Sequence, residues 1–148
     1  MNKEFIMRGQ TASGQTEILN FTGHTPGYAY RLVEFQLFPS TAIGTANNEL
    51  VGTITAGKTA VAPTDPNFTD PGLIATNYTV IAPVQYPSPL AYSVVNDTFL
   101  ITQDLILMVQ DAGSGGYSVN WQCRFVAEKL NSGEEAVANF KQFTIFDG

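Results

Sequence analysis

The sequence of 148 residues predicts an all-β protein, an antiparallel β-sandwich, from three observations. Apolar and polar residues alternate with a period of two, turn-forming residues recur between these runs, and no helical segment separates one run from the next. A period of two is typical of strands that bury one face. Without intervening helices, parallel β-α-β units are excluded. We therefore expect roughly eight short antiparallel strands in two packed sheets.

The first half of the chain contains four of these expected strands. They cover residues 3–8, 15–21, 28–38 and 50–55. In the third, we expect Ala29, Val33, Phe35 and Leu37 to share one face, and Pro39 to end the strand. Small residues then form a loop over 39–48.

A long irregular stretch over 56–72 follows, with prolines at positions 63, 66 and 71. Because proline restricts the backbone and charges are few, we expect an ordered surface loop. Residues 73–81 read as a strand with Ile74, Tyr78 and Val80 on one face. A proline-broken connection over 82–90 leads to a short edge strand at 92–95.

The clearest alternation lies near the C-terminal end, where strands over 99–109 and 117–128 flank the glycine loop 111–116. We expect these strands to form a long hairpin. The apolar row of the second strand contains Tyr117, Val119, Trp121, Cys123, Phe125 and Ala127. The single cysteine in this row, Cys123, is therefore expected to be a buried core residue.

The single helix that the sequence predicts lies near the C-terminal end. Ser132 and Glu135 have the spacing of a capping box, which predicts a short C-terminal helix over 134–141. A final strand or extended tail follows at 143–146. We expect residues 1–148 to form a single β-sandwich domain. A jelly-roll type is preferred over an immunoglobulin-like sandwich, because the Cys–Trp–Cys pattern of the latter is absent.

Composition narrows the classes of partner. Charged residues make up only 14% of the chain and the net charge is −6. Such a neutral polar surface is either covered by neighbouring subunits or belongs to an ordinary β domain rich in Thr and Asn. The seven basic residues are scattered singly, so we expect no direct nucleic-acid binding and no membrane partner. The chain shows no apolar run long enough for a signal peptide.

The sequence predicts no catalytic, cofactor or metal site, and we expect the protein not to be an enzyme. The single histidine, His24, is a candidate general base, but no Gly-x-Ser-x-Gly nucleophile motif accompanies it. Glu34 and Asp104 are the carboxylates considered for glycoside hydrolysis. For Asp104, which interrupts an apolar strand, a structural polar contact or protection against edge pairing explains the residue better.

Two further patterns have a structural and a functional interpretation. Asp65 and Asp70 supply oxygens that calcium prefers, but Asp and Asn beside proline more often cap turns. Four Asn-x-Thr sequons begin at Asn20, Asn67, Asn77 and Asn96. Without a signal peptide, we interpret them as chance in a chain rich in Asn and Thr rather than as glycosylation sites.

Three runs in the C-terminal part resemble small structural proteins of bacterial and marine viruses. They are 96–104 (NDTFLITQD), 119–125 (VNWQCRF) and 134–141 (EEAVANFK), and the stretch that they span covers about a third of the chain. The resemblance implies a jelly-roll or sandwich subunit of a symmetric shell, as a capsid, vertex or decoration protein. It carries no site residues to this chain.

We therefore expect a non-enzymatic virion structural protein that acts by self-assembly or by docking on a capsid. Its partners would be other copies of itself, in a homo-oligomer, and other capsid proteins; it would assemble in the host cytoplasm and reside in the virion. The expected contact surfaces are the loops 39–48, 56–72 and 82–91 and the two chain ends.

The alternative is a carbohydrate-binding or adhesin-like module. It is suggested by Trp121, by the acidic loop 65–70 and by tyrosines near turns. The tyrosines are Tyr28, Tyr30, Tyr78, Tyr86, Tyr92 and Tyr117.

Overall fold

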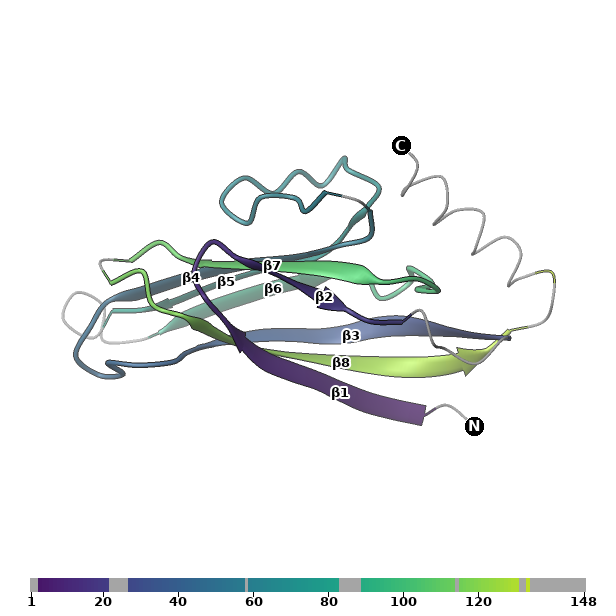
Figure 1. Cartoon of the computed structure of the whole chain (residues 1–148), viewed down its shortest axis with the longest axis horizontal. Coiled ribbons are helices and arrows are strands. Elements are labelled where there is room, and N and C mark those ends of the chain that lie inside the picture. Colours follow the sequence, from purple (N-terminus) through teal and green to yellow (C-terminus); the bar gives the residue numbers. More distant parts are fainter. Residues whose placement is uncertain are drawn as a thin grey trace.

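The computed structural model describes residues 3–21, 27–57, 59–82, 89–113, 115–130 and 133, and eight β-strands lie within them. The strands are β1 (Lys3–Thr11), β2 (Thr16–Leu19), β3 (Tyr28–Pro39), β4 (Asn48–Thr55), β5 (Leu73–Ile81), β6 (Leu90–Val95), β7 (Leu105–Asp111) and β8 (Val119–Lys129). They form two layers that face each other, as Figure 1 shows.

One layer is a three-stranded sheet in the order β1-β8-β3, and the other is a five-stranded sheet in the order β2-β7-β4-β5-β6. Every strand pair is antiparallel. The predicted all-β antiparallel sandwich is confirmed. The jelly-roll type stays a prediction. A jelly roll has eight strands in two sheets, and here the eight strands divide into three and five. The expected C-terminal helix over 134–141 and the last strand lie outside the described residues.

The core lies between the two sheets and follows the alternation seen in the sequence. On β8, Val119, Trp121, Cys123 and Phe125 are buried, as predicted. Facing them, β7 contributes a second row of buried aliphatic side chains at alternate positions. One end of the core is aromatic, with the Phe125 ring 5.3 Å from Phe5 and 5.0 Å from Phe21 between ring centroids.

The predicted hairpin between the last two long strands is wrong. β7 pairs with β2 and β4 in one sheet, whereas β8 pairs with β1 and β3 in the other. The segment 99–104 is not a strand; it contributes a single bridge between Ile101 and Tyr30. The glycine loop therefore carries the chain from one sheet to the other instead of turning it back within a sheet.

A β-bulge changes which residues of β3 face the core. The pairing shifts between Leu32, opposite Phe125, and Glu34, opposite Arg124, so that Val33 is the extra residue. Leu32 is consequently fully buried, and the expected inward position of Val33 is wrong. The strand still buries Phe35 and Leu37 as predicted.

The inward face of β5 carries polar side chains. Tyr78 is exposed, while Asn77 and Thr79 are buried on the opposite, inward face. These polar side chains are satisfied inside the sandwich: Asn77 Nδ2 donates to the backbone carbonyl of Phe35 at 2.9 Å, and Thr79 Oγ1 donates to Asn77 Oδ1 at 2.6 Å. The cross-sheet hydrogen bond explains why polar residues occupy positions that the alternation assigns to the outside.

The described part of the long loop after β4, residues 59–72, is hydrogen-bonded to β4. It lies over the outer face of the five-stranded sheet (Figure 1). Thr53 Oγ1 donates to the carbonyl of Val61 at 2.6 Å, and the Val61 N–H donates to Thr55 Oγ1 at 3.1 Å. Both threonines are buried although they point away from the core. The loop therefore covers the middle of this sheet, and its Phe68 lines a pocket together with Val94 and Val95 of β6.

Candidate interaction surfaces

The carboxylates considered for hydrolysis have separate structural partners. Glu34 forms an ion pair with Arg124, with 3.0 Å between Oε1 and Nη2. Asp104 Oδ1 accepts the backbone N–H of Phe21 at 2.5 Å. The predicted structural polar contact of Asp104 is confirmed, and it holds the entry to β7 against the segment that follows β2.

The acidic loop caps its own turns. Asp70 Oδ1 accepts the Gly72 N–H at 2.8 Å, and Asn67 Oδ1 accepts the Thr69 N–H at 3.0 Å. Among the described residues, no three His, Cys, Asp or Glu side chains gather into a group that could hold a metal ion. His24 lies outside the described residues.

Three of the four sequons make the same local hydrogen bond. In each, the threonine Oγ1 donates to the asparagine Oδ1: Thr69 to Asn67 at 2.7 Å, Thr79 to Asn77 at 2.6 Å, and Thr98 to Asn96 at 2.7 Å. At Asn67 and Asn96 the asparagine also accepts the backbone N–H of the threonine, which closes a turn. The spacing thus has a structural use at these positions, beyond the chance occurrence expected from composition.

Cys123 and Trp121 are core residues, as the alternation predicts for both. Burial raises the pKa of the Cys123 thiol far above its ordinary value, so the sulfur remains a neutral thiol rather than a nucleophile. Trp121 is buried and its Nε1 donates to Thr11 Oγ1 at 3.0 Å. Trp121 is therefore not available to stack on a ligand, which removes one observation behind the carbohydrate-binding alternative.

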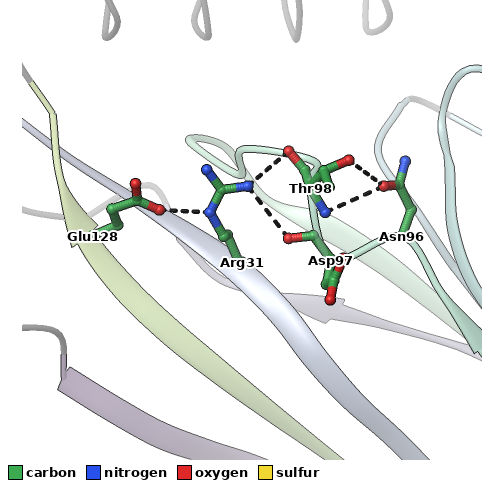
Figure 2. A network of polar contacts seen from close by, with 5 residues as sticks. All are labelled: Arg31, Asn96, Asp97, Thr98 and Glu128. Atoms are coloured by element: carbon green, nitrogen blue, oxygen red, sulfur yellow. Dashed lines mark hydrogen bonds and ion pairs between the residues drawn. The ribbon is translucent and has the colours of Figure 1, made fainter.

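A polar network fastens the connection between β6 and β7 to the edge of β3. Figure 2 shows Arg31 between Glu128 on one side and the turn 96–98 on the other. Arg31 Nε donates to Glu128 Oε2 at 2.5 Å, and Nη1 donates to the carbonyls of Asp97 and Thr98 at 3.3 and 2.9 Å. The guanidinium thus joins three segments that are distant in sequence, one of which belongs to the run 96–104.

The outer face of the three-stranded sheet carries a row of amide side chains, which we call the amide face: Gln10, Gln36, Asn120 and Gln122. Gln10 Nε2 donates to Asn120 Oδ1 at 2.9 Å. An open groove of about 600 Å³ runs over this face and is also lined by Arg8 and Phe38. Phe38 is exposed, so an aromatic ring stands beside neutral hydrogen-bonding groups.

The outer face of the other sheet carries an exposed apolar group at its edge, which we call the β6 patch: Leu90, Tyr92 and Val94 of β6 with Tyr78 of β5. Their exposed fractions are 45%, 63%, 52% and 41%. Tyr92 lies directly opposite Tyr78 in the register of the two strands. Sequence reasoning missed the patch as a whole, although residues 71–96 contain no Asp, Glu, Lys or Arg. This charge-free stretch is the signal that marks it.

The remaining tyrosines are divided between core and rim. Tyr30 packs into the aromatic end of the core, 5.5 Å from Phe5 between ring centroids, and Tyr28 and Tyr117 are half-buried. Tyr86 lies outside the described residues, as do positions 83–88 of the predicted contact loop 82–91. No helix in the described part of the chain has the length and apolar character that crossing a membrane requires.

The comparisons with known proteins give little beyond this description. No protein-family model matches the chain, and no curated protein matches it. Among solved structures, it is similar to a chain of the empty head of turnip yellow mosaic virus, with 9% sequence identity and a TM-score of 0.34. The similarity covers 88% of this chain and 82% of the viral one. The neighbour belongs to a virus, though not to a bacterial or marine one, and similarity at this level supports no conclusion about this chain.

Proposed function

We propose that this chain is a non-enzymatic structural component of a virion that acts by self-assembly or by docking on a capsid. The observation that supports this most is the β6 patch. Soluble monomeric proteins rarely expose neighbouring large apolar side chains in one group, and such groups commonly mark protein–protein contacts. The residues of the patch lie on two adjacent strands rather than singly, and no charged residue of the stretch 71–96 interrupts them.

The amide face supports the same proposal from the other side of the sandwich. It offers neutral donors and acceptors together with the exposed ring of Phe38. Neutral amides lose less on removal from water than charged groups do, provided that a partner satisfies them. A subunit in a shell is covered on more than one side, and both outer faces of this sandwich have side chains suited to being covered.

The test is the native mass of the purified protein, measured by light scattering after size exclusion, with electron microscopy of the same fractions. A closed ring or a shell is expected, and the mass gives its copy number. A species of 16.0 kDa at every concentration, which also fails to bind a capsid lattice, would contradict the proposal.

A carbohydrate-binding module is the second candidate, and the groove on the amide face favours it. Amides can donate to and accept from sugar hydroxyls, and Phe38 places an aromatic ring at the groove wall. A glycan array with and without calcium tests this function. Binding that is lost in Phe38→Ala and Gln122→Ala but retained in Tyr92→Ala would establish it, whereas an array without hits in both conditions would remove it.

A further inference from the structure

The two sheets have four edges, and three of them carry features that hinder pairing with another chain. Edge strands commonly avoid such pairing through charges, short length or covering segments. β1 carries the charges of Lys3, Glu4 and Arg8, and β2 is only four residues long and contains Glu17. At the edge of β3, Tyr30 exchanges two backbone hydrogen bonds with Ile101, at 2.9 and 2.8 Å.

The fourth edge, β6, has none of these features within the residues that the structure describes. Its six residues, LAYSVV, include no charge and no proline, and its register with β5 runs without a bulge from Leu90 to Val95. Within the described part of the chain, no other strand pairs with β6. Five of its six residues are exposed. A regular, uncharged edge strand of this kind is a template for adding a further strand.

We propose that β6 pairs in antiparallel fashion with β6 of a second copy across a two-fold axis, which joins the two five-stranded sheets into one. This inference rests on the proposed function, because it specifies one contact of the self-assembly. A two-fold axis perpendicular to the sheet keeps the outward face outward in both copies, so the contact is self-complementary.

The side chains of β6 favour a copy of the same strand as its partner. With the axis at Tyr92, the two Tyr92 side chains lie opposite each other, and Leu90 lies opposite Val94 of the second copy. Apolar and aromatic cross-strand pairs of this kind stabilise a sheet. The chain carries a net charge of −6, so copies repel each other over most contacts. Pairing through β6 places no charged residue opposite another.

Cysteine cross-linking tests the pairing directly. Directly opposed residues of antiparallel strands have Cα atoms about 4.5–5.5 Å apart, which is within the range of a disulfide. We therefore expect Tyr92→Cys to form a disulfide-linked dimer under mild oxidation. The control is Ile18→Cys, an equally exposed position on the outer face of the other edge strand, β2. The native Cys123 is buried and does not interfere.

The outcomes are distinct. A dimer from Tyr92→Cys that forms at least tenfold faster than one from Ile18→Cys supports the pairing. A fast dimer from Ser93→Cys alone supports it with the axis moved by one residue. The pairing is overturned if neither β6 variant cross-links faster than Ile18→Cys.

A second measurement separates this inference from the proposed function. Val94→Lys puts a charge on the exposed face of β6, and Ile18→Lys is its matched control. We expect the dissociation constant of self-association to rise at least tenfold in Val94→Lys and to stay unchanged in Ile18→Lys, with equal melting temperatures of both variants. If the wild type assembles and Val94→Lys assembles equally well, the pairing is wrong while the proposed function stands. A wild type that neither associates nor binds a capsid, and that does not cross-link as Tyr92→Cys, contradicts both.

Discussion

At the scale of the residue, the carboxylate of Asp111 determines how the chain leaves one sheet for the other. Oδ1 accepts the N–H groups of Glu49 and Gly113 at 3.1 and 2.9 Å, and Oδ2 accepts that of Tyr117 at 3.2 Å. The side chain is buried, and the three residues that donate to it are half-buried. One charged group thereby satisfies backbone donors of β4 and of the loop that leads to β8.

Replacing this carboxylate tests its role. We expect Asp111→Ala to lower the free energy of unfolding by about 3 kcal/mol, because it leaves three partly buried N–H groups without their acceptor. Asp111→Asn keeps one oxygen and is expected to cost less. Urea denaturation measures both, and Asp97→Ala, in an exposed turn, serves as the control. Equal stability of Asp111→Ala and Asp97→Ala would show that the loop does not depend on the carboxylate.

At the scale of the element, the distance between the sheets depends on a glycine in β4. A Cβ atom at Gly52 would lie 2.9 Å from Phe35 Cζ and 3.1 Å from Leu37 Cδ1, both on the opposite sheet. Only a residue without a side chain allows β3 to approach β4 this closely. Gly52 therefore permits the packing that buries Phe35 and Leu37.

A double-mutant cycle measures this close approach. We expect Gly52→Ala to cost about 1–3 kcal/mol through overpacking, and Leu37→Ala to cost about 2–5 kcal/mol through loss of buried apolar surface. The double variant should cost less than the sum, because removing the leucine branch makes room for the new methyl group. Chemical denaturation of the four proteins gives the coupling. Strict additivity would mean that the backbone shifts instead of the side chains clashing.

The hydrogen bonds of Arg31 are a second feature at this scale, because they hold the 96–98 turn against β3. Arg31→Ala removes the contacts to Glu128 and to the carbonyls of the 96–98 turn, and we expect a loss of about 1–2 kcal/mol. Hydrogen exchange localises the effect: the amides of Tyr30 and Ile101, which bond across the adjoining bridge, should exchange faster. Arg124→Ala, which removes the ion pair with Glu34 elsewhere on the same sheet, is the control. Unchanged exchange at Ile101 would show that the turn is held by other contacts.

These elements also show what the sequence could and could not predict. The period of two on β8 predicted Trp121, Cys123 and Phe125 as core correctly, because each residue follows the local pleat. The same rule failed on β3, where a bulge at Val33 shifts the alternation by one residue. It failed on the hairpin because sheet membership depends on long-range pairing.

The candidate surfaces were predictable only in part. The absence of charge in residues 71–96 is visible in the sequence, but the exposure of the β6 patch is not. The sequence places Tyr78 on one face of its strand together with Ile74. Only the pairing of β5 with β6 shows that Tyr78 lies beside Tyr92 on the outer face. The amide face likewise combines three strands, which only the sheet order brings together.

At the scale of the whole molecule, the sandwich presents two different outer faces. The three-stranded sheet is covered by amides and a few ion pairs, whereas the five-stranded sheet is covered by the loop 59–72 and, at its edge, by the β6 patch. Contacts through such faces involve apolar surface and backbone hydrogen bonds more than pairs of opposite charges. The remaining acidic residues give every copy the same sign of net charge.

This distribution predicts the response of self-association to salt. Copies with a net charge of −6 repel each other, and raising the salt from 0.1 to 1 M shortens the screening length from about 10 Å to about 3 Å. Because the proposed contact at β6 contains no ion pair to be weakened, we expect the dissociation constant to fall severalfold over this range of sodium chloride. Sedimentation velocity at each salt concentration measures it, with melting temperatures as the control for the fold. A dissociation constant that rises with salt would instead indicate an interface held by opposite charges. The uncharged strand β6 cannot supply such an interface. The contact would then have to lie on the outer face of the three-stranded sheet, which carries the ion pairs.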